Sequence, residues 1–459
     1  MSRFERLKVL DELFLHLEGP DTHMHVGAVA ILQGPPPAHE ELLEMVASRL
    51  HLVPRFRQKL ALIPFGAGRP VWVDDAHFTI EYHVRHSALP PPGSDEELRR
   101  LVARIMSQQL DRSKPLWEIW FAEGLTGNRF ALISKAHHCI VDGVAGIDLM
   151  SVIFDVGPEP VRVEAETWTP RPEPAPDELL RDALAELMTS PAEITRSVQS
   201  VLMDPGALPN KLVAAGRALS EFVGESFSAP PSSLNRPVGP HRRFETVLAD
   251  LAELKAVKNA LGGTVNDVVL AAVAGGLRTL LEGRGESVDG LELRVMVPVS
   301  LRPDGERGAL GNRVAAMWAA LPIHEADPIA RYELVRAAMR NLKSSGQTVG
   351  AQLLTRLGEY APPTVLAQAA RLIARQRAFN VVVTNVPGPQ FPLYTLGREM
   401  LEVYPVVPLS NNTSLGVALF SYNGAVCFGL LGDYDVASDL AVLAEGLEKS
   451  IAELRHAAG

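Results

Sequence analysis

The chain of 459 residues contains only two cysteines, Cys139 and Cys427, which are distant in sequence and outside any CxxC pattern. This scarcity argues against a disulfide framework and fits a reducing compartment such as the cytoplasm. The sequence also has no apolar, uncharged run long enough to cross a bilayer. Its first residues lack the basic, apolar and small-residue succession of a secretory signal. We therefore expect a cytoplasmic protein without a membrane span.

The chain has fewer basic than acidic residues, with 44 Lys and Arg against 54 Asp and Glu, and its net charge is −10. Such a chain is a poor general binder of nucleic acid, which needs clustered basic side chains to contact phosphates. HExxH and CxxC motifs are absent, and no second cluster of His and Cys is evident, so we predict no bound metal. Apolar residues make up 47% of the chain, as in a globular protein with large cores.

Helix-like and strand-like segments alternate along the sequence, which predicts a mixed α/β fold, and the length predicts two domains. A Pro- and Glu-rich connector starts near residue 156, and a second break covers 228–243. We place an N-terminal domain at 1–175, a helical crossover at 176–235 and a C-terminal domain at 236–459. The expected helices are 10–18, 40–53, 96–110, 144–155, 266–285 and 331–345, and the expected strands are 24–32, 115–125, 128–138, 293–302, 379–386 and a hairpin within 415–435.

Two adjacent histidines end the strand at 128–138 and precede an apolar helix. Alternation along the strand places His137 and His138 on opposite sides. An imidazole titrates near neutral pH, so one of them could take a proton from a hydroxyl and return it to a leaving group. Asp142 could brace the loop, and Gly143 permits a close backbone approach. The alternatives are two buried histidines satisfied by backbone bonds, and a metal site, which would need further ligands.

Residues 137–143 read HHCIVDG and match the HHxxxDG motif of a large superfamily of CoA-dependent acyltransferases. Further stretches agree in order, among them LDELFLHLEGPDTHMHVGAVAIL, DRSKPLWEIWFAEGL, TVNDVVLAAVAGGLR, VPVSLR, TNVPGP and YNGAVCFGLLGDYD. Over about residues 9–440 the chain resembles the bacterial wax ester synthase/acyl-CoA:diacylglycerol acyltransferase family. The resemblance implies two chloramphenicol-acetyltransferase-like domains, each a mixed sheet flanked by helices, with an active-site tunnel between them.

The resemblance also implies a reaction, in which His138 is the general base and His137 supports it. His138 would deprotonate a diacylglycerol or long-chain alcohol hydroxyl, which attacks the thioester of acyl-CoA without an acyl-enzyme. Acyl-CoA is then a co-substrate, and no cofactor or metal is required. By the same resemblance Asp142 is a structural brace that pairs with an arginine, for which we nominate Arg302; an ordinary surface charge is the alternative for Arg302.

Three further motifs follow from the resemblance. Asn266 and Asp267 match its ND motif, where the Asn266 amide could hold the alcohol or a support loop while Asp267 fixes the orientation of that amide. By residue chemistry alone, TVND is a helix start that Thr264 or Asn266 could cap. Thr384 and Asn385 are candidate oxyanion donors, or simply the start of a turn. A PLW motif is matched by residues that we interpret as core rather than substrate contact, namely Pro115, Leu116 and Trp117.

Two other functions fit parts of the sequence. The chain could be a non-catalytic lipid-binding or lipid-droplet paralogue, although such a protein has no use for a base at His138. It could also be another HHxxxDG acyltransferase, such as a condensation domain, although the PLW, ND and NVPGP stretches argue against this. The family further implies peripheral association with the inner membrane or lipid droplets.

Overall fold

The computed structural model describes residues 4–140, 152–161, 163–164, 167–189, 229–300, 314–344 and 378–459. Asp142, Gly143 and Arg302 lie outside these described residues, as do most of the expected helix at 144–155 and the helical segments expected up to about 228.

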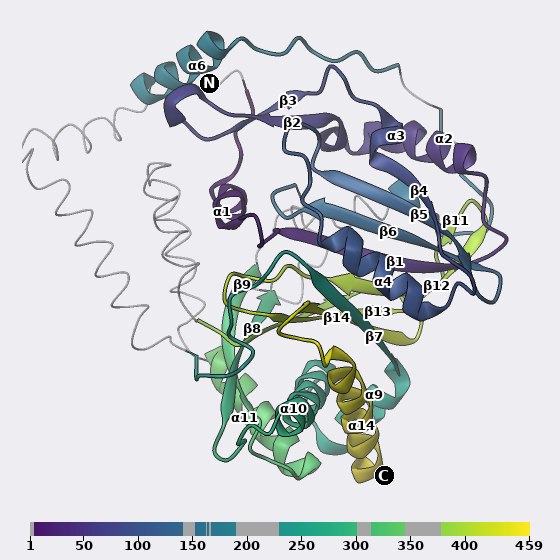
Figure 1. Cartoon of the computed structure of the whole chain (residues 1–459), viewed down its shortest axis with the longest axis vertical. Coiled ribbons are helices and arrows are strands. Elements are labelled where there is room, and N and C mark those ends of the chain that lie inside the picture. The colour runs from purple at the N-terminus through teal and green to yellow at the C-terminus, as the bar shows by residue number, and fades with distance from the viewer. Residues whose placement is uncertain are drawn as a thin grey trace, which may run out of the picture.

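The first half of the chain, with two strands from the second half, forms a six-stranded sheet in the order β11-β12-β1-β6-β5-β4 (Figure 1). All its pairs are antiparallel except β4–β5, which is parallel. The strands are β1 (His25–Gln33), β4 (Val84–Ala88), β5 (Trp117–Leu125), β6 (Arg129–His137), β11 (Tyr394–Thr395) and β12 (Arg398–Val406). A separate two-stranded sheet pairs β2 (Gln58–Ala61) with β3 (Val71–Asp74).

The second half forms another six-stranded sheet, in the order β7-β14-β13-β10-β8-β9. It is also mixed, because β10 pairs in parallel with both β13 and β8 while the other pairs are antiparallel. Its strands are β7 (Arg242–Asp250), β8 (Glu292–Ser300), β9 (Val314–Pro322), β10 (Val381–Pro387), β13 (Leu415–Tyr422) and β14 (Ala425–Asp433). Asn423 and Gly424 both have positive φ, as the expected two-residue hairpin turn between β13 and β14 requires.

Helices accompany both sheets (Figure 1). With the first sheet lie α1 (Val9–Leu17), α2 (His39–Arg49), α3 (Ile80–His83) and α4 (Asp95–Met106), with the 3-10 turns η1 (Leu50–Leu52) and η2 (Pro54–Arg57). α6 (Pro176–Thr189) and η3 (Pro64–Gly66) pack beside the two-stranded sheet. The second sheet packs against α9 (Leu251–Leu261), α10 (Val265–Gly283), α11 (Pro328–Ser344) and α14 (Leu440–Ala458). The predicted architecture of two mixed sheets flanked by helices is therefore confirmed.

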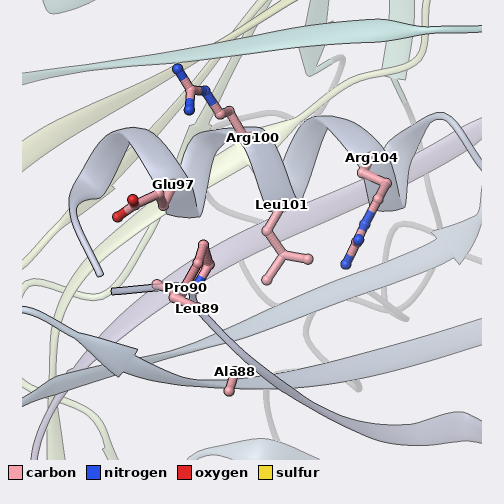
Figure 2. Close-up of a pocket in the computed structure, with 7 residues that line it drawn as sticks. All are labelled: Ala88, Leu89, Pro90, Glu97, Arg100, Leu101 and Arg104. Carbon is pink, nitrogen blue, oxygen red and sulfur yellow. The ribbon is translucent and has the colours of Figure 1, made fainter. Parts of the chain in front are cut away.

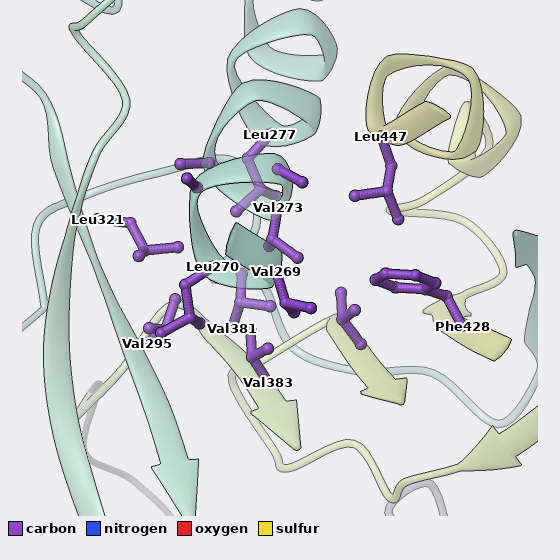
Figure 3. Packing of buried hydrophobic residues seen from close by; sticks show 14 of the residues in the cluster. Val269, Leu270, Val273, Leu277, Val295, Leu321, Val381, Val383, Phe428 and Leu447 are labelled. Carbon is purple, nitrogen blue, oxygen red and sulfur yellow. The ribbon is translucent and has the colours of Figure 1, made fainter. Parts of the chain in front are cut away.

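The core of the second half is built around α10, which is apolar on nearly every side (Figure 3). Its Val269 and Leu270 share a buried cluster with Val295, Val381 and Phe428 of the sheet. A helix that is hydrophobic all round has to be enclosed by other elements. Among the described residues no single helix is long and apolar enough to cross a membrane.

The second half contributes two strands to the first sheet. β12 belongs to the second half by sequence, yet its residues 400–406 pair with β1 in the interior of the first sheet. Where β12 meets β14, a Cβ built on Gly429 would lie 1.9 Å from the Pro405 carbonyl oxygen, so only glycine fits there. The first sheet is consequently completed by residues from 236–459, which we assigned to the C-terminal domain from the sequence.

Candidate active site

His137 and His138 lie at the C-terminal end of β6, where the chain leaves the sheet. The backbone N–H of His137 donates to the Leu116 carbonyl at 2.9 Å, and that of His138 donates to the Met24 carbonyl at 2.8 Å. The Ile140 N–H closes a turn onto the His137 carbonyl at 3.0 Å. Neighbouring segments therefore hold the backbone of both histidines in place.

The ring of His138 lies at the edge of the protein interior. It is half-buried and stacks on Phe14 of α1, with ring centroids 3.8 Å apart and planes 16° from parallel. Its Nδ1 is buried and has no hydrogen-bond partner among the described residues. Burial lowers the pKa of His138 to about 4, while its own backbone carbonyl raises it and His137 lowers it further. At neutral pH the ring is therefore uncharged, as a proton acceptor must be.

His137 is enclosed, with 1% of its surface exposed. Its Nδ1 accepts the Cys139 backbone N–H at 3.1 Å, and its Nε2 lies 3.5 Å from Glu18 Oε2. His25, which pairs with His137 across β1 and β6, places its Nε2 3.4 Å from Glu18 Oε1. Arg112 donates to Glu18 from Nε at 2.9 Å and also from Nη2. Glu18 thus contacts His137, His25 and Arg112 together.

Burial would raise the pKa of Glu18, but the nearby rings of His137 and His25 and the hydrogen bonds from Arg112 outweigh it and hold the carboxyl ionised. Sequence reasoning missed Glu18, His25, Arg112 and the stacking partner Phe14. The available signal was an acidic residue ending an apolar helix, followed by two histidines in the segment EGPDTHMH.

The ND motif begins α10, as its residue chemistry suggested. Thr264 is the N-cap, and its hydroxyl accepts the Asp267 N–H at 3.3 Å, while Asp267 Oδ2 accepts the Thr264 N–H and hydroxyl, each at 2.8 Å. The Asp267 carboxylate is thus occupied by the capping box. Asn266 instead accepts a hydrogen bond on Oδ1 from the Asn385 amide at 3.2 Å.

Thr384 and Asn385 lie on β10 and are both half-buried. Thr384 is opposite Ala418 of β13. The structure therefore brings Asn266 and Asn385 together on the second half, while the two histidines stand on the first. The three residues of the PLW motif are all buried at the start of β5: Pro115, Leu116 and Trp117.

A surface pocket lies between α4 and the chain following β4 (Figure 2). Its charged lining residues are Glu97, Arg100 and Arg104. Glu97 accepts the Ser94 hydroxyl in the capping box of α4, and Arg100 pairs with Glu96 one turn earlier. The pocket holds none of the predicted site residues, and two of its three charges are paired within the helix, so we do not assign the reaction to it. The tunnel implied between the two domains stays a prediction.

The family assignment rests on comparisons with known proteins. The wax ester synthase/diacylglycerol acyltransferase catalytic domain model matches residues 7–269, and the C-terminal domain model of that family matches 310–455. This chain belongs to the wax ester synthase/diacylglycerol acyltransferase family. The predicted enzyme class, an acyl-CoA-dependent O-acyltransferase, is thereby confirmed.

Individual relatives agree over the whole length. The probable diacylglycerol O-acyltransferase tgs1 of Mycobacterium tuberculosis is 35% identical, covering 98% of this chain and 95% of that protein. The probable diacylglycerol O-acyltransferase tgs2 of the same species is also 35% identical and covers 98% of each. The structure of the wax ester synthase/diacylglycerol acyltransferase from Marinobacter aquaeolei VT8 superposes with a TM-score of 0.72 at 27% identity, covering 99% of this chain and 100% of that one.

A more distant likeness concerns the fold alone. The starter condensation domain of rhizomide synthetase has a TM-score of 0.56 at 13% identity, over 99% of this chain and 94% of that domain. The two-domain architecture is therefore shared with condensation domains, as the HHxxxDG resemblance implied.

The buried histidines predict how stability depends on pH. Burial lowers the pKa of His25 to about 3 and those of His83 and His138 to about 4, whereas the unfolded chain binds their protons near a pH of about 6.5. The unfolded state thus holds more protons between these values, and stability falls as the pH drops through about 6.5 toward 4. We expect urea unfolding to show about 1–2 kcal/mol lost per histidine between about pH 7 and pH 5. Equal unfolding free energies at both pH values would contradict the neutral, buried state of these rings.

Proposed function

We propose that this protein transfers a long-chain acyl group from acyl-CoA to diacylglycerol, to a long-chain alcohol, or to both, with His138 as the general base. The observation that carries the proposal is the position of His138, which is half-buried and held at a strand end, where burial lowers its pKa to about 4. The names of the relatives support both kinds of acceptor, and those of the two mycobacterial proteins support diacylglycerol.

The chemistry proceeds in two proton transfers around one tetrahedral intermediate. Nε2 of His138 takes the proton of the acceptor hydroxyl as its oxygen bonds to the thioester carbon. The carbonyl oxygen becomes an oxyanion, the C–S bond then breaks, and the imidazolium gives the proton to the departing CoA sulfur. One C–O bond replaces one C–S bond, and the proton passes from the hydroxyl to the sulfur through His138. The proposed transfer is direct and uses no acyl-enzyme, metal or cofactor.

The oxyanion needs a hydrogen-bond donor opposite the base. The Asn385 amide and the Thr384 hydroxyl at β10 are our proposed donors, and the hydrogen bond to Asn266 restrains the direction of the Asn385 amide. Asp267 then acts on this group indirectly, by capping the helix that carries Asn266. The brace role of Asp142, its pairing with Arg302 and the close backbone approach at Gly143 stay predictions, because these residues lie outside the described part of the chain.

Substrates with long alkyl chains imply contact with a lipid surface. We therefore also propose that the protein is cytoplasmic and associates peripherally with the inner membrane or with lipid droplets. Its support within the chain is apolar surface in the segment after β2, where Leu62 is 74% exposed and Phe65 is 96% exposed. Because the net charge is −10, such contact would depend on apolar side chains rather than on attraction to anionic lipid.

The test is an assay of the purified protein with palmitoyl-CoA and either dioleoylglycerol or hexadecanol, following free thiol and the lipid product together. We expect thiol release to require an acceptor and to equal the ester formed. Binding of both lipids without any thiol release would instead support the non-catalytic lipid-binding alternative. Thiol release that is independent of either acceptor would also contradict the proposal.

A further inference from the structure

Glu18 occupies an unusual place for a carboxylate. It is the C-cap residue of α1, and its side chain is 1% exposed. Burying a charge this completely is costly unless the charge is paired and hydrogen-bonded. Its partners are Arg112, His25 and His137, and of these only Arg112 is permanently cationic. One arginine already balances the charge, so the contacts with the two histidines call for a separate explanation.

The hydrogen bonds of His137 determine which of its nitrogens carries the proton. Nδ1 accepts the Cys139 backbone N–H at 3.1 Å, so this nitrogen has no proton in the neutral ring. The proton must then be on Nε2, which lies 3.5 Å from Glu18 Oε2, a contact at the limit of hydrogen-bond length and outside hydrogen-bond geometry. In the other tautomer, Nδ1–H would oppose the Cys139 N–H and Nε2 would present a lone pair to a carboxylate.

Helix α1 acts on both histidines at once. Phe14 stacks on the His138 ring, and Glu18, one turn further along, faces His137. Meanwhile the Cys139 N–H held by His137 lies in the turn that carries His138 out of the sheet. Without Glu18, the tautomer of His137 would be restrained by the Cys139 N–H alone, and the hydrogen bond that stabilises this turn would be weaker.

We propose that Glu18 is a positioning residue for the reaction: its carboxylate holds His137 in the Nε2–H form, and His137 in turn braces the backbone that presents His138. This inference rests on the proposed role of His138 as the base. Glu18 does not touch the reacting atoms in this account. His25 and Arg112 share the carboxylate, and Arg112 ties it to α1 by also donating to a backbone carbonyl of that helix at 3.0 Å.

The test compares two substitutions at this position. Glu18→Leu removes the acceptor, and Glu18→Gln keeps an acceptor oxygen while removing the charge. We expect kcat to fall about 10- to 100-fold in Glu18→Leu, because small misplacements of a reacting group have effects of this size. We expect a smaller fall in Glu18→Gln, and KM values for both substrates within about threefold of the wild type, since nothing that binds substrate is changed.

Glu12→Gln is the matched control. Glu12 is also a buried glutamate of α1, 2% exposed, and its partner is His16 rather than His137. This variant should keep the wild-type kcat. If Glu12→Gln and Glu18→Leu lose kcat equally, or if Glu18→Leu stays within about twofold of the wild type, the positioning role is refuted.

Long-range 1H–15N NMR spectra of histidine-labelled protein provide a readout separate from activity. The His137 signals, assigned with His137→Gln, should show the Nε2–H form in the wild type and a mixture of tautomers in Glu18→Leu. Unchanged His137 signals in Glu18→Leu would overturn the inference even if activity fell. Full activity in a His138→Ala variant would refute the proposed function instead, and the NMR comparison would still decide whether Glu18 sets the tautomer.

Discussion

Replacing His138 by alanine is expected to lower kcat for acyl transfer about 100- to 10 000-fold, the range typical of a removed general base. In the folded protein the ring is uncharged at neutral pH, its Nδ1 is buried and its backbone is held by Met24. Alanine preserves this backbone while removing the atom to which we assign proton transfer. The measurement is thiol release from palmitoyl-CoA at saturating dioleoylglycerol, or hexadecanol if that is the better acceptor.

His51→Ala is the control for this experiment. His51 lies on η1, away from β6, and is half-buried. Its Nδ1 forms a hydrogen bond with the Ser48 carbonyl at 2.8 Å. We expect this variant to keep wild-type turnover. If His138→Ala, with an unchanged thermal unfolding midpoint, turns over within about tenfold of the wild type, the base is a different group and the mechanism is wrong.

Replacing Trp117 by alanine is expected to reduce the free energy of unfolding by about 3–5 kcal/mol, the usual cost of deleting a large buried aromatic side chain. Trp117 is 1% exposed and is stacked by Phe56 and His83, with ring centroids 4.8 Å and 4.6 Å away. Its Nε1 donates to the Phe56 carbonyl at 2.8 Å, and this acceptor would also lose its partner. Urea unfolding followed by circular dichroism measures the change.

Trp120→Ala is the comparison, because Trp120 lies on the same strand and is only half-buried. Its Nε1 donates to Glu118 Oε2 at 3.0 Å. We expect a clearly smaller loss of stability there. A loss in Trp120→Ala equal to or larger than that in Trp117→Ala would contradict the account of the PLW segment as part of the core.

Much of the fold was predictable because its elements are locally encoded. Apolar runs predicted strands at 115–125 and 128–138, and the structure has β5 and β6 there, paired antiparallel with Trp117 opposite Ala136. The pair Asn423 and Gly424 located the turn between β13 and β14, since both residues tolerate positive φ. A capping residue just before an apolar run likewise located the start of α10.

The contribution of β11 and β12 to the first sheet left no such local trace. β12 joins the first sheet beside β1, although the two strands come from opposite ends of the chain. Hydrophobic alternation predicts that a segment is a strand but carries no information about which distant strand it pairs with. For this reason a division of the chain by linkers alone could not show that residues 394–406 complete the N-terminal sheet.

For the site, the sequence by itself determined the motif, because a motif depends on residue types at short spacing, and the family resemblance over the whole chain implied the enzyme class and the base. Only the tertiary structure decided what surrounds that base. Phe14 and Glu18 reach the histidines from a helix far earlier in the chain, and Asn266 meets Asn385 from another element. Contacts between distant segments fix the burial, tautomer and direction of polar groups, and these physical properties cannot be read from neighbours along the chain.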